Sequence, residues 1–108
     1  MDDRTDRKLL ELAAKAAGYQ YRPQNQVIVV GGIPSNWNPL TDDGDALRLA
    51  VKVGIRISYD FQNDLTECVY DIDGDFYDLT EPWSEDKFAA TRRAVVRAAA
   101  EIGAKEGE

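Results

Sequence analysis

The chain has 108 residues, of which 44% are hydrophobic and 31% are charged, a composition typical of a folded protein rather than a disordered one. Thirteen basic residues against 20 acidic ones give a formal charge of −7, which argues against nucleic-acid binding, since that needs clustered lysines and arginines. Histidine is absent, which excludes the usual hydrolase triads and zinc sites made of histidine and cysteine; we therefore expect no enzymatic activity, no metal and no cofactor.

Length, composition and cysteine count also limit the domain organisation and the cellular compartment that we expect. We expect a single domain over residues 1–108, long enough to bury a core. No apolar run approaches the roughly 20 residues needed to cross a bilayer. The opening MDDRTDRKLLELAA lacks the basic start and apolar stretch of a secretory signal. The single cysteine, Cys68, cannot form an internal disulfide, so we expect a protein of the reducing cytoplasm without membrane partners.

The first predicted elements are a helix and a strand. Apolar residues recur at helical spacing from Asp2 to Ala17, and Gly18 follows as a helix stop. Residues 19–26 are expected to be a connector. The apolar, β-branched run Val27–Val30 then predicts a short buried strand.

A loop over residues 31–40 is expected to lead into a second helix. Thr41 is the predicted N-cap, because its hydroxyl can accept from the free amides of the first turn. The helix presents an apolar stripe of Ala46, Leu49, Ala50 and Val53, and Gly54 is expected to end it.

The second half of the chain predicts a hairpin-rich sheet. Alternating apolar and polar residues indicate a strand at Ile55–Tyr59, followed by a turn over residues 60–64. Strands are expected at Glu67–Ile72 and Asp75–Leu79, joined by Asp73-Gly74, a pair that favours a type I′ turn.

A last helix completes the expected fold. Ser84 is its predicted N-cap and Gly103 its predicted end, with residues 104–108 frayed. The order helix, strand, helix, three strands, helix predicts an α+β fold, in which helices pack on a small, mainly antiparallel sheet.

Two segments carry a resemblance to a known family. WNPLTDDGDALRLAVKVGI, Trp37–Ile55, and AATRRAVVRAAAEIG, Ala89–Gly103, resemble the phage ABA (alpha-beta-alpha) sandwich domain, found in small proteins of tailed phages and prophages. The resemblance covers most of the chain and is looser in the hairpin region between the two segments. It implies a helix–sheet–helix sandwich encoded by a phage accessory gene and present in the host cytoplasm. It brings no known activity and no catalytic residues.

The acidic hairpin is the first candidate binding surface. From Ile57 to Asp86 the chain has no lysine or arginine, but it has many acids, including Asp73 and Asp75 beside the turn glycine. Such a surface can imitate nucleic acid toward a basic protein. The alternative is that the acids provide solubility and protect the sheet edge from aggregation.

The second candidate site is aromatic and basic. Trp37, flanked by Asn36 and Asn38, could stack a base or anchor a partner; alternatively, it folds back over the helix that it precedes. Arg92, Arg93 and Arg97 cluster on about one side of the last predicted helix and could hold a phosphate-bearing ligand; alternatively, they are a solvated face paired with Glu101 and the acidic hairpin. For a small ligand, Trp37 would stack, and Arg48, Arg92 or Arg93 would supply the charge.

Two functional hypotheses follow. The first is a small phage or prophage accessory protein that binds a host or phage protein through its acidic hairpin face. The alternative is a protein that binds or sequesters a small nucleotide-like or phosphorylated ligand. Exposed edge strands and alanine-rich helix faces would also allow a homo-oligomer.

Overall fold

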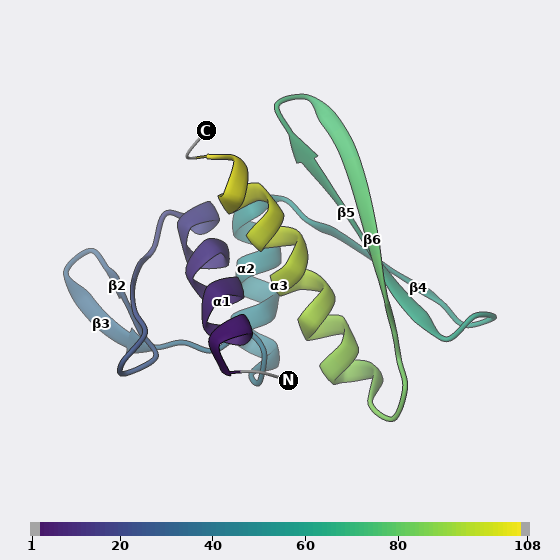
Figure 1. The fold of residues 1–108 in the computed structure, drawn as a ribbon, viewed down its shortest axis with the longest axis horizontal. Helices are drawn as coiled ribbons and strands as arrows, with labels where there is room; N and C mark the ends of the chain where they lie inside the picture. Colours follow the sequence, from purple (N-terminus) through teal and green to yellow (C-terminus); the bar gives the residue numbers. More distant parts are fainter. Residues whose placement is uncertain (1–2, 107–108) are drawn as a thin grey trace.

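The computed structural model describes residues 3–106 and has helices at the centre, with antiparallel strands on either side of them (Figure 1). In chain order its elements are α1 (Asp3–Ala17), β1 (Gln20–Arg22), β2 (Val27–Val30), β3 (Ile33–Asn36), α2 (Asp43–Val53), β4 (Arg56–Asp60), β5 (Leu65–Ile72), β6 (Asp75–Pro82) and α3 (Lys87–Lys105). The predicted α+β fold with helices packed on antiparallel sheet is therefore confirmed.

Helix α3 is the centre of the packing. It contacts α1, α2, β5 and β6, and its alanines Ala94, Ala98 and Ala99 are completely buried. Small side chains let helix backbones approach closely. The closest approach is at Gly103, where an added Cβ would lie 1.9 Å from the backbone oxygen of Leu12 in α1. The sequence-based prediction that Gly103 ends the helix is wrong, because α3 continues to Lys105.

The strands form two three-stranded sheets rather than one. The orders are β1-β2-β3 and β4-β5-β6, and all neighbours are antiparallel. Residues 19–26 and 31–40, expected to be a connector and a loop, contain β1 and β3. Both are short and largely exposed strands beside β2, so they carry no apolar alternation. Their strand conformation comes from backbone pairing with β2.

The predicted N-caps of the second and last helices are also wrong, because neighbouring aspartates cap α2 and α3. Asp42, not Thr41, caps α2 by accepting from the Asp45 N–H, and Asp86, not Ser84, caps α3. An ionised carboxylate is the stronger acceptor for the positive end of a helix. Ser84 itself has a left-handed backbone with φ of 52°.

The hairpin β5–β6 agrees with its sequence signal and is longer than expected. Asp73 and Gly74 both have positive φ, 54° and 90°, as a type I′ turn requires. The ladder continues from Ile72 opposite Asp75 to Leu65 opposite Pro82, so β6 extends past Leu79. Over residues 3–106, no helix has the length and apolar character needed to cross a membrane.

Candidate functional site

An apolar groove lies between α2, α3 and β4. Its volume is about 360 Å³, and its walls include Leu47 of α2, Val95 of α3 and Ile57 of β4. Four large apolar side chains that line the groove are mostly exposed: Leu47 (61%), Tyr59 (54%), Phe61 (69%) and Phe88 (62%). Contiguous exposed apolar surface of this kind marks interaction sites on soluble proteins.

A chain of hydrogen bonds runs from Trp83 and Thr91, which line the groove, to the buried Thr66. The indole Nε1–H of Trp83 donates to Thr66 Oγ1 at 2.8 Å, and Thr66 Oγ1 lies 2.7 Å from Thr91 Oγ1. Thr91 uses its one hydroxyl proton to donate to the Lys87 carbonyl at 2.8 Å. Thr66 must therefore donate to Thr91 while it accepts from Trp83, so every proton in the chain has one assigned acceptor.

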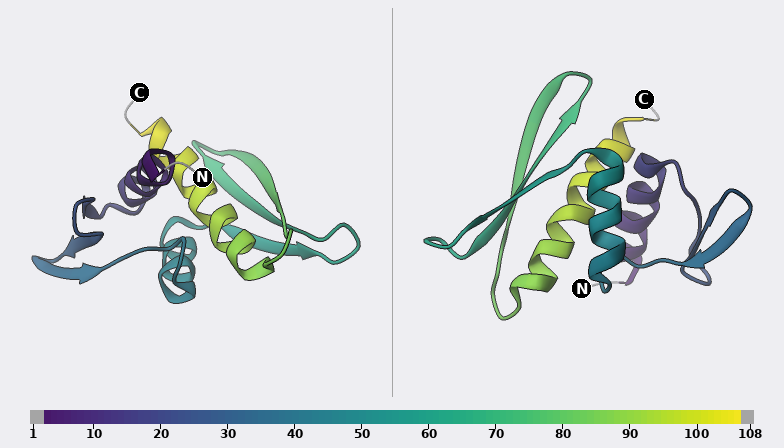
Figure 2. Two further views of the ribbon diagram at one scale, coloured as in Figure 1. Left: turned by 60° about the horizontal axis from the view of Figure 1, so that its bottom comes forward. Right: turned by 180° about the vertical axis from the view of Figure 1, so that it is seen from behind.

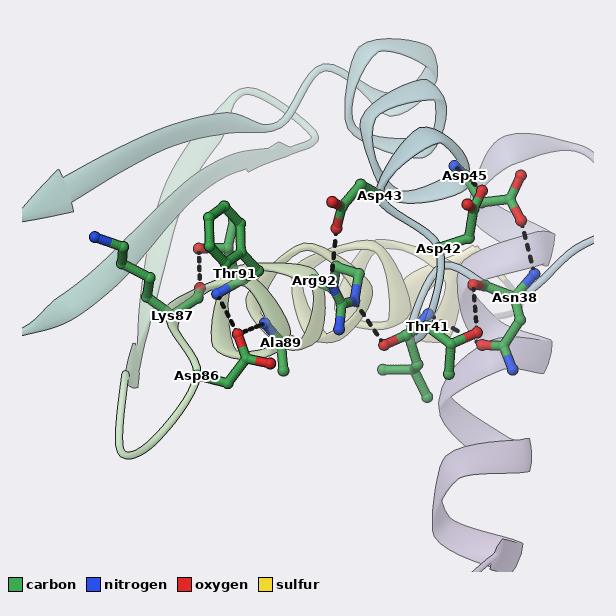
Figure 3. Close-up of polar contacts among 12 residues, drawn as sticks. Asn38, Thr41, Asp42, Asp43, Asp45, Asp86, Lys87, Ala89, Thr91 and Arg92 are labelled. Carbon is green, nitrogen blue, oxygen red and sulfur yellow. Dashed lines mark hydrogen bonds and ion pairs between the residues drawn. The ribbon is translucent and has the colours of Figure 1, made fainter.

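The charged rim of the groove is tied to the fold. Figure 3 shows Arg92 reaching from α3 to Asp43 at the start of α2, where Nη1 lies 2.7 Å from Oδ1. Its Nε donates to the Leu40 carbonyl at 2.9 Å. On the opposite side, the Lys87 ammonium lies 5.5 Å from the Trp83 ring centroid and 5.6 Å from that of Phe61. These contacts fix the shape of the groove.

The predicted aromatic and basic site is only partly assembled. Asn36, Trp37, Asn38 and Arg48 line one hollow of about 440 Å³. The Trp37 side chain itself is buried, with 3% exposure, and it packs edge-to-face on Tyr19 and Tyr21 at centroid distances of 5.8 and 5.5 Å. Its large apolar ring therefore belongs to the core, and the ring is not offered as a stacking surface.

Asn38 and Arg48, two polar residues of this hollow, are already paired. Asn38 donates its backbone N–H to Asp45 Oδ2 at 2.9 Å and accepts from the Leu40 N–H at 3.0 Å. Arg48 Nη2 lies 2.8 Å from Asp45 Oδ1 and 3.8 Å from Asp42 Oδ2. The hydrogen bond that Arg48 donates to Asp45 is the main reason that the pKa of Arg48 is raised. Two carboxylates against one guanidinium leave this hollow net negative, which disfavours a phosphate.

Arg93 and Arg97 tie secondary-structure elements together. Arg93 Nη2 lies 3.5 Å from Asp6 Oδ1 of α1. Arg97 Nη1 lies 2.6 Å from Glu81 Oε2 and donates to the Thr80 carbonyl at 3.1 Å, which pins β6 onto α3. Arg48, Arg92 and Arg93 thus occupy separate places and do not converge on one ligand.

The outer face of the sheet β4-β5-β6 is not covered by any described helix (Figures 1 and 2). Cys68 and Tyr70 of β5 are buried on the helix side, so Glu67, Val69 and Asp71 point outward. The ladder registers add outward neighbours from β4 and β6. We call this surface the acidic face; its charged residues are Arg56, Asp60, Glu67, Asp71 and Asp78, with Asp73 and Asp75 exposed at the hairpin turn.

Two carboxylates of the acidic face, Glu67 and Asp78, are diagonal neighbours on the β5–β6 ladder and interact. A side-chain hydrogen bond with Asp78, with the Asp78 charge as a lesser contribution, raises the pKa of Glu67 above its ordinary value. Asp60 and Asp71 differ, because they accept backbone N–H bonds: Asp60 from Gln62 and Asn63, and Asp71 from Gly74. The hydrogen bonds from Asn63 are the main reason that the pKa of Asp60 is lowered.

Comparison with protein-family models, with curated proteins and with solved structures finds no match. Among residues 3–106 there is no group of three or more histidine, cysteine, aspartate or glutamate side chains arranged to hold a metal. Burial raises the pKa of the Cys68 thiol to about 12, so the thiol stays protonated in the folded protein.

The groove is the feature that sequence reasoning missed. Its residues come from four separate stretches of the chain, and only the fold brings them together. One signal was present: Leu47 and Val51, four residues apart, lie off the apolar stripe that packs α2 onto the core. A second apolar stripe on one helix indicates a second contact surface.

Proposed function

We propose that this protein acts by binding, and that it docks a basic protein partner through the acidic face. The observation that carries the proposal is the placement of Glu67 and Asp78 as diagonal neighbours on the outer face of the β5–β6 ladder, where their interaction raises the pKa of Glu67. Two like charges held together cost free energy in the unbound protein. A partner's lysine or arginine seated between the two carboxylates would remove that cost.

The surroundings of this pair suit a protein partner. Phe76 lies opposite Asp71 on the ladder, and its side chain is 71% exposed. An aromatic anchor inside a polar surround is the usual composition of a protein-binding hot spot. Arg56 is the only basic residue that the ladder registers add to this face, so complementarity favours a basic surface.

The test compares capture of proteins from bacterial lysate by three forms of the tagged chain. Glu67→Gln/Asp78→Asn removes the carboxylate pair, and Glu11→Gln/Glu106→Gln removes two exposed carboxylates elsewhere. We expect one stoichiometric basic protein with the wild type and the control, and its loss with the first variant. Equal capture by all three forms would overturn the proposal. Charge reversal at Asp73 and Asp75 tests the contribution of the hairpin turn.

We also propose a phage or prophage origin and a role in the host cytoplasm. Support comes from the resemblance of Trp37–Ile55 and Ala89–Gly103 to the phage ABA sandwich domain. The partner would then be a host or phage protein. Identification of the captured protein by mass spectrometry tests this directly.

A second function, binding of a small nucleotide-like ligand, is favoured by one observation: Asn36, Trp37, Asn38 and Arg48 line the same hollow. A ligand that binds only the folded state raises the melting temperature by mass action. The pairing of Arg48 with Asp45 leads us to expect no shift across a panel of nucleotides. A shift abolished by Arg48→Ala would establish this function instead.

A further inference from the structure

The outer edge of β4 is an unpaired strand edge beside an exposed apolar groove. In the order β4-β5-β6, β4 is terminal, so one side of its backbone has no ladder partner among residues 3–106. An uncovered edge next to apolar side chains is a strong template for another strand. Figure 2 (left) shows α2 and β4 along the same side of the molecule, and both line the groove.

We infer that this edge pairs with the same edge of a second copy, which makes a two-fold symmetric dimer with a continuous six-stranded sheet. The sequence of β4, Arg56-Ile57-Ser58-Tyr59-Asp60, is complementary to itself when it is reversed. Antiparallel pairing about a two-fold axis at Ser58 places Arg56 opposite Asp60 of the second copy and Ile57 opposite Tyr59. Each contact occurs twice, as an isologous interface requires.

The outer-face pairs in this register are electrostatically favourable. Arg56 is exposed and makes no ion pair with the residues that the structure describes. Asp60 accepts hydrogen bonds from the backbone of Gln62 and Asn63 and from the Asn63 side chain, which fix its carboxylate at the end of β4. Those bonds favour the ionised form of Asp60. A fixed, ionised carboxylate is the right partner for a free guanidinium.

The groove-side pairs are apolar. Ile57 and Tyr59 lie on the face of β4 that lines the groove, and Tyr59 is 54% exposed in the single chain. Cross-strand pairs of aromatic and β-branched residues are among the stabilising ones. Around them, the exposed side chains of Leu47, Phe61 and Phe88 border the approaching copy and supply apolar area to bury.

The inference does not rest on the proposed partner, because Glu67 and Asp78 belong to β5 and β6 and take no part in the backbone pairing of the β4 edge. Its consequence for that function is geometric. A two-fold axis perpendicular to the sheet keeps both acidic faces on the same side, so the dimer would present one continuous acidic surface. Its formation also neutralises Arg56, the one basic residue of that face.

The first test is the mass of the protein in solution. Sedimentation equilibrium should give twice the 12.1 kDa chain mass at micromolar concentration. Arg56→Glu places two like-charge pairs in the interface, and we expect the dimer dissociation constant to rise about tenfold or more. Lys8→Glu makes the same charge change on an exposed position of α1 and should leave the dimer intact.

The second test fixes the register. The two copies of Ser58 face each other at the axis, so their Cβ atoms should lie within about 5 Å, close enough for an engineered disulfide. Ser58→Cys should therefore cross-link under mild oxidation. Thr80→Cys, exposed on the same sheet face at the β6 edge, should not cross-link. The native Cys68 is buried and stays protonated, so it does not interfere.

Each outcome of these two tests either supports or overturns the inference. A dimer that weakens with Arg56→Glu and cross-links through Ser58→Cys supports the inference. A monomer at all concentrations overturns it. A dimer that cross-links through Thr80→Cys, or through neither cysteine, places the interface elsewhere and also overturns it. None of these readouts depends on capture of a basic partner.

Discussion

Replacing Gly103 by alanine should destabilise this protein, although the same change inside a helix normally stabilises it by about 1 kcal/mol. An alanine Cβ at this position would lie 1.9 Å from the Leu12 oxygen, 2.8 Å from its carbonyl carbon and 3.3 Å from the Ala16 nitrogen. Ordinary contact begins at 3.4 Å, so α1 and α3 must separate by about 1.5 Å (3.4 − 1.9). The obstacle is backbone, which cannot turn aside as a side chain can.

The magnitude follows from the packing that this separation disturbs. Ala13 of α1 and Ala99 of α3 are fully buried and would lose contact. Overpacking typically costs about 1–3 kcal/mol, and a clash with backbone belongs at the upper end or above it. After subtraction of the helix-propensity gain, the expected net loss is about 2 kcal/mol. With roughly 2.1 cal/mol/K of unfolding entropy per residue, this lowers the melting temperature by about 9 °C.

Gly44 in the first turn of α2 is the matched control. The nearest neighbours of a Cβ there are the Arg48 guanidinium nitrogens at 3.2 Å, at the end of a flexible side chain. Gly44→Ala should be neutral or slightly stabilising. Urea denaturation followed by tryptophan fluorescence, with thermal melts by circular dichroism, measures both variants. If Gly103→Ala is as stable as Gly44→Ala, the close approach of α1 and α3 is refuted.

Three further predictions concern the sheet β4-β5-β6. Thr66→Val should lower the free energy of unfolding by about 2 kcal/mol in urea denaturation, because it leaves the Trp83 N–H buried without an acceptor. Trp83→Phe should then lower the free energy of unfolding less in the Thr66→Val protein than in the wild type. The raised pKa of Glu67 means that the folded state binds its proton more tightly, so this residue's contribution to stability falls as pH rises from 4.5 through the folded value. Glu67→Gln should therefore flatten this part of the pH profile measured by calorimetry and raise stability at pH 7; an unchanged profile would contradict the contact with Asp78. Cys68, with a pKa raised to about 12, should react with a thiol reagent at pH 8 only when the protein unfolds, and fast labelling of the native protein would exclude its burial.

Part of the candidate site could be predicted from the sequence. The acids of the hairpin and the Asp73-Gly74 turn are local features, and they lie where the alternation of β5 and the turn geometry predict. The interaction between Glu67 and Asp78 could not be predicted from the sequence. It depends on the register of β5 against β6, in which Val69 is opposite Asp78 and Glu67 is its diagonal neighbour.

Trp37 illustrates the opposite case. The sequence left open whether Trp37 is an exposed loop residue or folds back over the helix that follows it, but its partners Tyr19 and Tyr21 lie more than a dozen residues earlier in the chain. Those tyrosines meet it because β1 pairs with β2 and β2 with β3. No local pattern around Trp37 carries that information.

The sequence by itself determined the three helices, the β5–β6 hairpin and the strongly acidic character of one region. These depend on residues within a few positions of one another: apolar spacing, an aspartate or glycine at an element's end, and the count of charges. Tertiary structure alone decided that β1 and β3 are strands, that Gly103 lies inside a helix, and that α2, α3 and β4 enclose a groove. Each of these results from contact between segments distant in the chain, where backbone pairing and close packing override local preference.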